Sequence, residues 1–319
     1  MRARLRSLRR RLGSAIIVGI FKNLSRLGAL LPASRPAAHG LEVLRDLPYI
    51  DDGDPQHTLD VYRQKSREGL KPAVLYLHGG AFQFLSKDTH WLMGLLFARA
   101  GYVVFNANYR LAPKAKYPAA IEDACAALLW VKAHAVEYGA DPERIVVAGE
   151  SAGGNLALAL VVAASFRRPE PFAQEVFDSG LRVVAAVPAC GILQVTDIQR
   201  LARRRALPAF VNDRLVECSR GYLEDADTHP PLTLADPLCI IEEVESERPL
   251  PPVYTFVGTS DALLDDTRRL KRALDLREVP CEIRYYPKRV HAFHALYWDR
   301  AAQACWTEQF KVLEAWVNR

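Results

Sequence analysis

A serine flanked by small residues is the clearest sign of chemistry in this sequence. It lies in the segment Gly149-Glu150-Ser151-Ala152-Gly153, between an apolar run that begins at Arg144 and a helix-like run that begins at Ala152. A serine hydroxyl is a weak nucleophile unless a turn presents it to a base, and small residues on either side allow a strand to reverse tightly into a helix. The pattern predicts that Ser151 is a nucleophile, exposed at the carboxyl end of a strand.

A glycine pair follows another predicted strand earlier in the chain. The run 73–77 leads into His78-Gly79-Gly80-Ala81-Phe82. When a nucleophile attacks a carbonyl carbon, negative charge develops on the oxygen, and backbone N–H groups can stabilise it where no side chain stands in the way. We expect the N–H groups of Gly79, Gly80 and Ala152 to form this oxyanion hole.

Three further segments complete a resemblance to a known family. They are Tyr109-Arg110-Leu111-Ala112-Pro113, Tyr117-Pro118-Ala119-Ala120 with Asp123, and Asp141-Pro142-x-Arg144-Ile145. With the two motifs above, this order resembles the hormone-sensitive-lipase-like branch of the α/β-hydrolase superfamily, over roughly residues 45–319. The resemblance implies an α/β-hydrolase fold, with a mostly parallel eight-stranded sheet flanked by helices and a helical cap. The chain departs from the branch at Ala81, in place of a third glycine, and at Glu150, in place of Asp or Thr.

The acid of a triad on this fold follows the nucleophile in the chain and comes after a strand. The apolar run 253–257 leads into Gly258-Thr259-Ser260-Asp261, so Asp261 is the expected acid. Asp265 and Asp266 are alternatives, but both open a predicted helix, where the helix dipole already favours acidic side chains. The carboxylate is expected to orient the catalytic base and to stabilise its protonated form.

The base is expected after the last strand. The predicted strand 282–286 is followed by two histidines, of which His291 comes first and has Phe293 two residues later, as in the family that the chain resembles. We therefore expect His291 to be the base, with His294 as the alternative. His78 is expected to support the oxyanion loop rather than to transfer protons.

Short β-rich runs alternate with helical stretches along most of the chain, which is typical of a mostly parallel sheet covered on both faces. Strands are predicted at residues 58–62, 73–77, 102–106, 144–148, 183–188, 253–257 and 282–286. Helices are predicted at residues 91–100, 118–138, 152–165, 265–276 and 300–317. The alternation breaks over residues 191–251, which indicates an inserted lobe. The resemblance then implies an N-terminal segment that contributes to the cap (1–45), a catalytic domain (46–190 and 252–319) and a cap insertion (191–251).

Composition and charge exclude several classes of protein. The 319 residues are 50% hydrophobic and 25% charged, which suits a globular chain with a large core. Residues 1–50 hold ten basic and two acidic residues, whereas the remainder holds 32 basic and 35 acidic ones, which argues against a nucleic-acid partner. The six cysteines lack metal-binding or redox spacing, so we expect free thiols, no metal and a cytoplasmic location, with membrane association as an alternative.

The Arg-rich N-terminus predicts an amphipathic helix. Apolar residues recur every three or four positions, at Leu5, Leu8, Leu12, Ile16, Ile20, Leu24, Leu27 and Leu31. The apolar run 15–21 is short for a signal peptide and lacks a small-residue cleavage site, and no run is long enough for a transmembrane helix. We expect residues 1–31 to contact either the cap or an anionic membrane surface.

These residues together predict a serine carboxylesterase that forms an acyl-enzyme and needs no metal or organic cofactor. The resemblance implies short- to medium-chain acyl esters as substrates, and Phe82, Phe84 and Leu85 are expected to line an apolar pocket. An amidase or aryl formamidase could use the same groups. A ligand receptor on this fold is a further alternative, although such receptors typically lose the histidine that this chain keeps. A homodimer is compatible with the sequence.

Overall fold

An eight-stranded sheet forms the centre of the computed structural model, which describes residues 19, 21–66, 68–226, 228–230 and 232–318. The strand order is β1-β2-β4-β3-β5-β6-β7-β8. The strands are β1 (Leu41–Pro48), β2 (Thr58–Gln64), β3 (Lys71–Leu77), β4 (Val103–Ala107), β5 (Ala140–Glu150), β6 (Val183–Ala189), β7 (Val253–Gly258) and β8 (Cys281–Tyr286). β3 to β8 run parallel, and β1 and β2 form an antiparallel edge.

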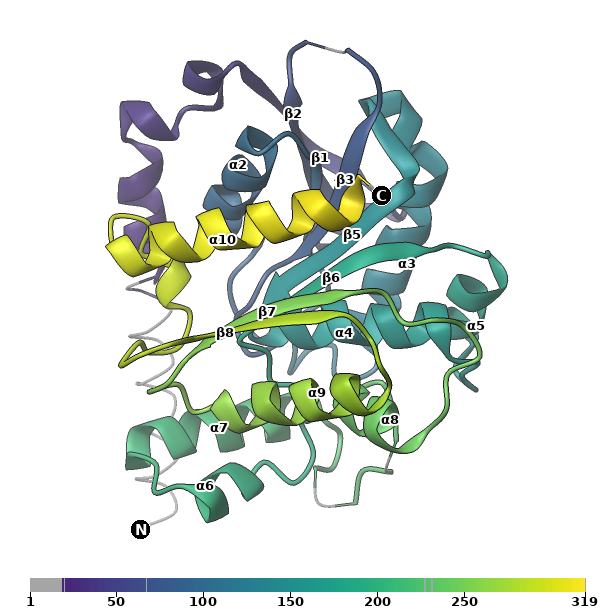
Figure 1. Ribbon diagram of the computed structural model, residues 1–319, viewed down its shortest axis with the longest axis vertical. Coiled ribbons are helices and arrows are strands. Elements are labelled where there is room, and N and C mark those ends of the chain that lie inside the picture. Colours follow the sequence, from purple (N-terminus) through teal and green to yellow (C-terminus); the bar gives the residue numbers. More distant parts are fainter. Residues whose placement is uncertain (1–18, 20, 67, 227, 231, 319) are drawn as a thin grey trace.

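Helices cover both faces of the sheet (Figure 1). After the N-terminal helix, the α-helices of the described residues are α2 (Trp91–Arg99), α3 (Ala119–His134), α4 (Ala152–Ser165), α5 (Pro171–Asp178), α6 (Arg200–Arg204), α7 (Ala209–Tyr222), α8 (Pro237–Glu243), α9 (Leu264–Leu276) and α10 (Arg300–Val317). Short 3₁₀ turns lie at Pro32–Ser34, Pro36–His39, Pro55–His57, Lys87–His90, Ala135–Tyr138 and Phe293–Ala295. α2 and α10 share one buried cluster on one face, and α3, α4 and α9 pack into the cluster on the other.

Helix α4 is buried along its whole length and packs on β5 and β6. Its residues are small or aliphatic on every side, with only Asn155 and Ser165 carrying polar side chains. A helix that is apolar all round is stable only inside a core. This burial fixes the start of α4 relative to the carboxyl end of β5, and Ser151 lies between the two.

The predicted mostly parallel sheet is confirmed, and each predicted strand is present with small shifts of its ends. The sequence prediction missed β1, because this edge strand carries Glu42, Arg45 and Asp46 among its apolar residues and pairs only with β2. The helix predicted over 118–138 is divided into α3 and a 3₁₀ turn, which ends where Gly139 adopts a φ of 81°.

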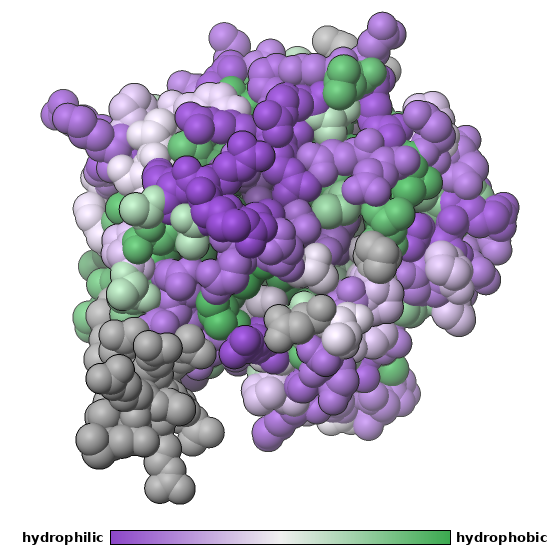
Figure 2. All heavy atoms as spheres, turned by 90° about the horizontal axis from the view of Figure 1, so that it is seen from below, coloured by the Kyte–Doolittle hydropathy of each residue, from purple (hydrophilic) through white to green (hydrophobic). Residues whose placement is uncertain are grey.

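The N-terminal helix and the insertion are both partly visible. Residues 21–29 are helical, whereas the earlier part of the predicted amphipathic helix lies outside the described residues. None of the helices in the described ranges combines the length and the apolar content that crossing a lipid bilayer requires. Between β6 and β7, where the sequence predicts an insertion at residues 191–251, lie α6, α7 and α8, in the lower part of Figure 1. Seen from below in Figure 2, the surface is mostly polar and its apolar patches are small and scattered.

Candidate active site

The predicted strand-turn-helix arrangement is present at Ser151. Its backbone angles, φ 57° and ψ −115°, are rare for a residue with a side chain and cost on the order of 1–3 kcal/mol. The flanking glycines permit the turn, because a Cβ on Gly149 would lie 2.5 Å from the carbonyl oxygens of Leu77 and Gly153. A Cβ on Gly153 would overlap the Leu77 oxygen. Close packing against β3 therefore holds Ser151 at the turn.

The turn leaves a backbone donor beside the serine. The N–H of Ser151 donates to the carbonyl oxygen of Ala189 at 3.0 Å. α4 begins at Ala152, and the first N–H groups of a helix have no acceptor within the helix. The Ala152 N–H is therefore available to an oxygen atom bound next to Ser151.

The loop after β3 is held by its carbonyl oxygens. The His78 carbonyl accepts from the Tyr109 hydroxyl at 2.7 Å, and the Gly79 carbonyl lies 2.7 Å from His78 Nδ1. The Gly80 carbonyl accepts from the N–H groups of residues 83 and 84, each at 2.9 Å. Because a peptide is planar, fixing a carbonyl also fixes the direction of the N–H that follows it. The N–H groups of Gly80 and Ala81 are oriented in this way.

One residue of the expected oxyanion hole is corrected by the structure. The N–H of Gly79 donates to Oε1 of Glu150 at 2.7 Å, so it is not free to bind a substrate oxygen. For the N–H groups of Gly80 and Ala81, no acceptor is found within the described part of the chain. Gly80 must be glycine, because its φ is 118° and a Cβ would overlap the Phe84 carbonyl oxygen. The free donors are thus at Gly80, Ala81 and Ala152.

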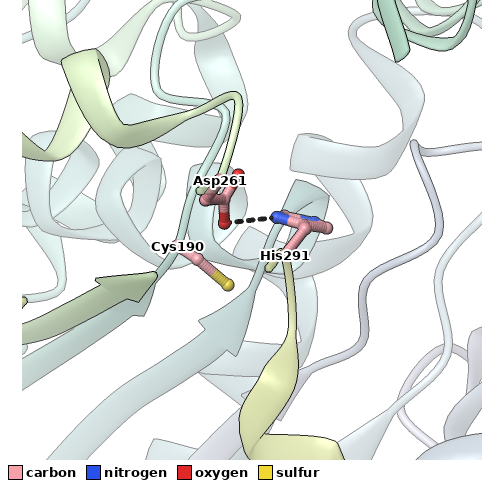
Figure 3. Close-up of side chains that lie close together, drawn as sticks. All are labelled: Cys190, Asp261 and His291. Atoms are coloured by element: carbon pink, nitrogen blue, oxygen red, sulfur yellow. Dashed lines mark hydrogen bonds and ion pairs between the residues drawn. The ribbon is translucent and has the colours of Figure 1, made fainter. Parts of the chain in front are cut away.

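The structure brings Asp261 and His291 together from the loops that follow β7 and β8 (Figure 3). His291 Nδ1 lies 2.8 Å from Asp261 Oδ2, and Asp261 Oδ1 accepts from the Leu263 N–H at 2.9 Å. The Asp261 side chain is 1% exposed, whereas that of His291 is 40% exposed. Removal from water lowers the pKa of His291, but the charge and hydrogen bond of Asp261 outweigh this effect, so the pKa is raised overall.

Asp266 and His294, an alternative acid and the alternative base, are buried and contact other partners. Asp266 is buried in an ion pair with Arg200 at 2.6 Å and also accepts from the Leu193 N–H at 2.9 Å. His294 is buried between Phe256 and Trp306, and burial lowers its pKa to about 4. Both residues therefore have roles in packing that need no substrate.

Cys190 follows β6 and places its sulfur beside the Asp261–His291 pair (Figure 3). The ligand atoms of these three residues lie within 4.8 Å of one another, so the group could hold a metal ion. The hydrogen bond between Asp261 and His291 already accounts for their arrangement. Burial, followed by the charge of Asp261, raises the pKa of the Cys190 thiol, which favours a neutral thiol next to the pair.

The residues expected to line an apolar pocket differ in their exposure. Phe82 is fully buried and stacks on Tyr222 of α7, with ring centroids 3.8 Å apart, so the expectation that it lines an open pocket was wrong. Gln83 also contacts α7, donating from Nε2 to the Glu217 carbonyl oxygen at 3.1 Å. Phe84 and Leu85 are partly exposed and remain candidates for the pocket wall.

Two buried residues behind the loop were missed as parts of the site. In the sequence, Glu150 stood out only as a departure from the hormone-sensitive-lipase-like branch, and no role in the site was expected for His90. The structure joins His90 Nε2 to Glu150 Oε1 at 2.6 Å. The one signal in the sequence was an acidic residue at the end of an otherwise apolar strand. Its buried partners come from a different part of the chain.

Comparison with known proteins agrees with this geometry. A sequence profile described as the α/β-hydrolase fold matches residues 74–295, which is more than half of the chain. The chain belongs to the α/β-hydrolase family. The resemblance to the hormone-sensitive-lipase-like branch of this family is confirmed.

Several esterases are similar to this chain in sequence or structure. Esterase LipI of Mycobacterium tuberculosis is 35% identical over 231 residues, which span 70% of this chain and 65% of LipI. An acetyl esterase of Salmonella schwarzengrund is 32% identical over 72% of this chain and 68% of its own length. The Pyrobaculum calidifontis esterase matches with a TM-score of 0.73 and 25% identity, covering 98% of this chain and 97% of its own. Esterase LipW of Mycobacterium marinum matches with a TM-score of 0.70 and 27% identity, covering 94% of this chain and 88% of LipW.

Proposed function

We propose that this α/β-hydrolase is a serine carboxylesterase. The observation that carries the proposal is the hydrogen-bonded pair of Asp261 and His291, which lies in loops of the same sheet as the strained turn at Ser151. The free N–H groups of Gly80, Ala81 and Ala152 supply donors for an oxyanion. The esterase names of the relatives support the same reaction class.

The proposed reaction proceeds through an acyl-enzyme. Oγ of Ser151 attacks the carbonyl carbon of the ester while Nε2 of His291 takes the hydroxyl proton. The three backbone donors stabilise the negative charge on the carbonyl oxygen. When the intermediate collapses, the C–O bond to the alcohol breaks and His291 returns its proton to the leaving oxygen. Water then attacks the acyl-serine by the same steps, which releases the acid and restores Ser151.

We infer that the substrates are short- to medium-chain acyl esters. The partly exposed Phe84 and Leu85 offer apolar surface close to the proposed hole, and one relative is an acetyl esterase. A series of p-nitrophenyl esters of increasing chain length, with a matched p-nitroanilide, tests this proposal beside the Ser151→Ala variant. Faster cleavage of the anilide would indicate an amidase, and turnover that survives Ser151→Ala would refute the proposed nucleophile.

We also propose that the N-terminal helix contacts an anionic membrane surface rather than the cap. The side chain of Ser25 bonds to the Trp91 indole N–H and to the Thr89 carbonyl, so this helix packs on the catalytic body. Three residues of the apolar stripe are exposed: Leu24 at 45%, Leu27 at 63% and Leu31 at 58%. Exposed leucines beside a basic segment suit the boundary between headgroups and acyl chains.

A further inference from the structure

A buried carboxylate lies directly behind the oxyanion loop. Glu150 precedes Ser151 at the end of β5, and it is 4% exposed. Its Oε1 accepts from the Gly79 N–H at 2.7 Å and lies 2.6 Å from Nε2 of His90, while its Oε2 accepts from the Tyr76 hydroxyl. A buried carboxylate is tolerated only when such partners satisfy it.

His90 carries the balancing positive charge. Its Nε2 faces the Glu150 carboxylate, and its Nδ1 lies 3.0 Å from both the Ser86 carbonyl oxygen and Oγ1 of Thr89. The Thr89 hydroxyl donates its own proton to the Ser86 carbonyl at 2.7 Å, so both atoms next to Nδ1 act as acceptors. Both ring nitrogens therefore face acceptors, which favours the protonated ring. Burial lowers the pKa of His90, but Glu150 outweighs this effect and the pKa is raised overall. Burial raises the pKa of Glu150, yet the charge of His90 and its hydrogen bonds bring it down to about 2.

The neighbouring histidine does not compete for this charge. The ring of His78 is 5.5 Å from that of His90 and stacks on Tyr109 with centroids 4.3 Å apart. Burial, followed by the charge of His90, lowers the pKa of His78 to about 3, so its ring is neutral. The buried cluster therefore holds a single ion pair, between Glu150 and His90.

The Glu150 carboxylate also explains why the loop begins with glycine. A Cβ on Gly79 would lie 2.6 Å from Glu150 Oε1 and 3.0 Å from the Glu150 carbonyl oxygen. The His78–Gly79 peptide is thus held at both ends, by Tyr109 at its carbonyl and by Glu150 at its N–H. The next two N–H groups, at Gly80 and Ala81, are the free donors of the proposed hole.

From this geometry we infer that Glu150 and His90 are positioning residues for the oxyanion hole. Their buried ion pair holds the Gly79 N–H, and through it the direction of the Gly80 and Ala81 donors relative to Ser151. Both residues are only 4% exposed, so they would act through the loop and not by direct contact with a substrate. The inference rests on the proposed esterase function, because it assigns a support to that function's transition-state donors.

The test compares kcat with KM in Glu150→Ala, Glu150→Gln and His90→Gln. Donors that act only on the transition state affect kcat rather than KM. We expect Glu150→Ala to lower kcat about tenfold to a hundredfold. The upper end of this range is the loss of kcat expected when one oxyanion donor is removed. Glu150→Gln keeps an oxygen acceptor for Gly79 and is expected to lose less. Asp266→Asn is the matched control, since it disturbs another buried carboxylate that binds a cation and a backbone N–H.

A trifluoromethyl ketone provides a direct probe of the hole. Ser151 is expected to add to it reversibly, and the resulting oxyanion would occupy the hole. A methyl ketone of the same shape is the control, because its carbonyl is less electrophilic and adds a serine hydroxyl poorly. In the Glu150 variants, we expect the inhibition constant of the trifluoromethyl ketone to rise by the same factor by which kcat falls. In Asp266→Asn, we expect this inhibition constant to be unchanged. A folded Glu150→Ala variant with wild-type kcat and wild-type ketone affinity would overturn the inference, and so would a loss seen equally in Asp266→Asn.

The protonation state of His90 separates this inference from the proposed function. In protein labelled with ¹⁵N-histidine, both ring nitrogens of His90 should carry protons at neutral pH, and the signal should become that of a neutral ring in Glu150→Gln. His90→Gln assigns the resonance. A neutral His90 in the wild-type protein would overturn the ion pair. Absence of ester turnover in the wild-type protein would refute the esterase proposal and leave this spectrum as the test of the pair.

Discussion

His291 Nδ1 and Asp261 Oδ2 lie 2.8 Å apart, so the opposite ring nitrogen of His291, Nε2, is left outside this pair. A carboxylate bound at Nδ1 selects the tautomer in which Nε2 can accept a proton. In the proposed mechanism the pair thus specifies which nitrogen of His291 acts as the base, although the two residues come from loops after different strands.

Ser151→Ala and His291→Ala are each expected to lower kcat on the order of 10⁴-fold or more. Nucleophile and base act as one unit, so the double variant should be no slower than either single one. Steady-state hydrolysis of p-nitrophenyl acetate measures this, with His294→Asn as the comparison. An inactive His294→Asn beside an active His291→Ala would show that the base has been assigned to the wrong histidine.

The pH dependence of kcat/KM should report the Asp261–His291 pair. A general base works in its neutral form, and the pKa of His291 is raised from its usual 6.5. The rate should therefore rise with pH along a limb centred above 6.5. In Asp261→Asn the limb should move to lower pH, because the raising charge is lost, while kcat falls by up to about 10⁴-fold. An unmoved limb in that variant would assign the titration to another group.

Ala81→Gly should change kcat by less than about tenfold, because the substitution keeps the backbone N–H that would bind the oxyanion. Ala81 has a φ of 54°, which glycine adopts with less strain, so the free energy of unfolding should rise by about 1 kcal/mol or less. Kinetics and urea denaturation measure the two effects. A change in kcat beyond about a hundredfold would mean that the methyl group itself shapes the hole.

Co-sedimentation with anionic vesicles at low salt tests the proposed membrane contact. The full chain should sediment with the vesicles, and a chain beginning at Ala33 should not. Each basic residue near such a surface contributes about 1 kcal/mol, so raising the salt concentration should weaken binding. Leu27→Ser should reduce binding, whereas Leu276→Ser, which removes an 87% exposed leucine from α9, serves as the matched control. Full-length protein that stays in the supernatant would refute the contact.

Local sequence signals were enough to place the turn at Ser151 and the loops of Asp261 and His291. Each of these positions follows an apolar strand, so the strand pattern and the adjoining motif were read together. Contacts between distant segments were not visible in the same way. Gly79 was expected to be a free donor, because nothing near it in the sequence shows that Glu150 lies behind it.

The same limitation affected the aromatic residues beside the loop. Phe82 was expected to line a pocket because it lies next to the glycine pair in the sequence. Its stacking partner, Tyr222, could not be predicted, because the segment 191–251 has no regular apolar period that would indicate how it packs. The N-terminal stripe had the right period for a helix, but periodicity does not say what covers its apolar side. In the structure, Leu24, Leu27 and Leu31 are exposed to solvent.

The stacking of Phe82 on Tyr222 ties helix α7 of the insertion to the loop that carries the proposed oxyanion donors. Gln83 strengthens the tie through its hydrogen bond to the backbone of the same helix. Under the proposed function, substrate selectivity and rate are therefore coupled, because a substitution on the side of α7 that carries Tyr222 also disturbs the loop that holds the proposed oxyanion donors. On the same proposal, we expect substitutions at the buried Tyr222 to alter the rate, and substitutions at outward positions of the helix, such as the 47% exposed Phe210, to alter it less.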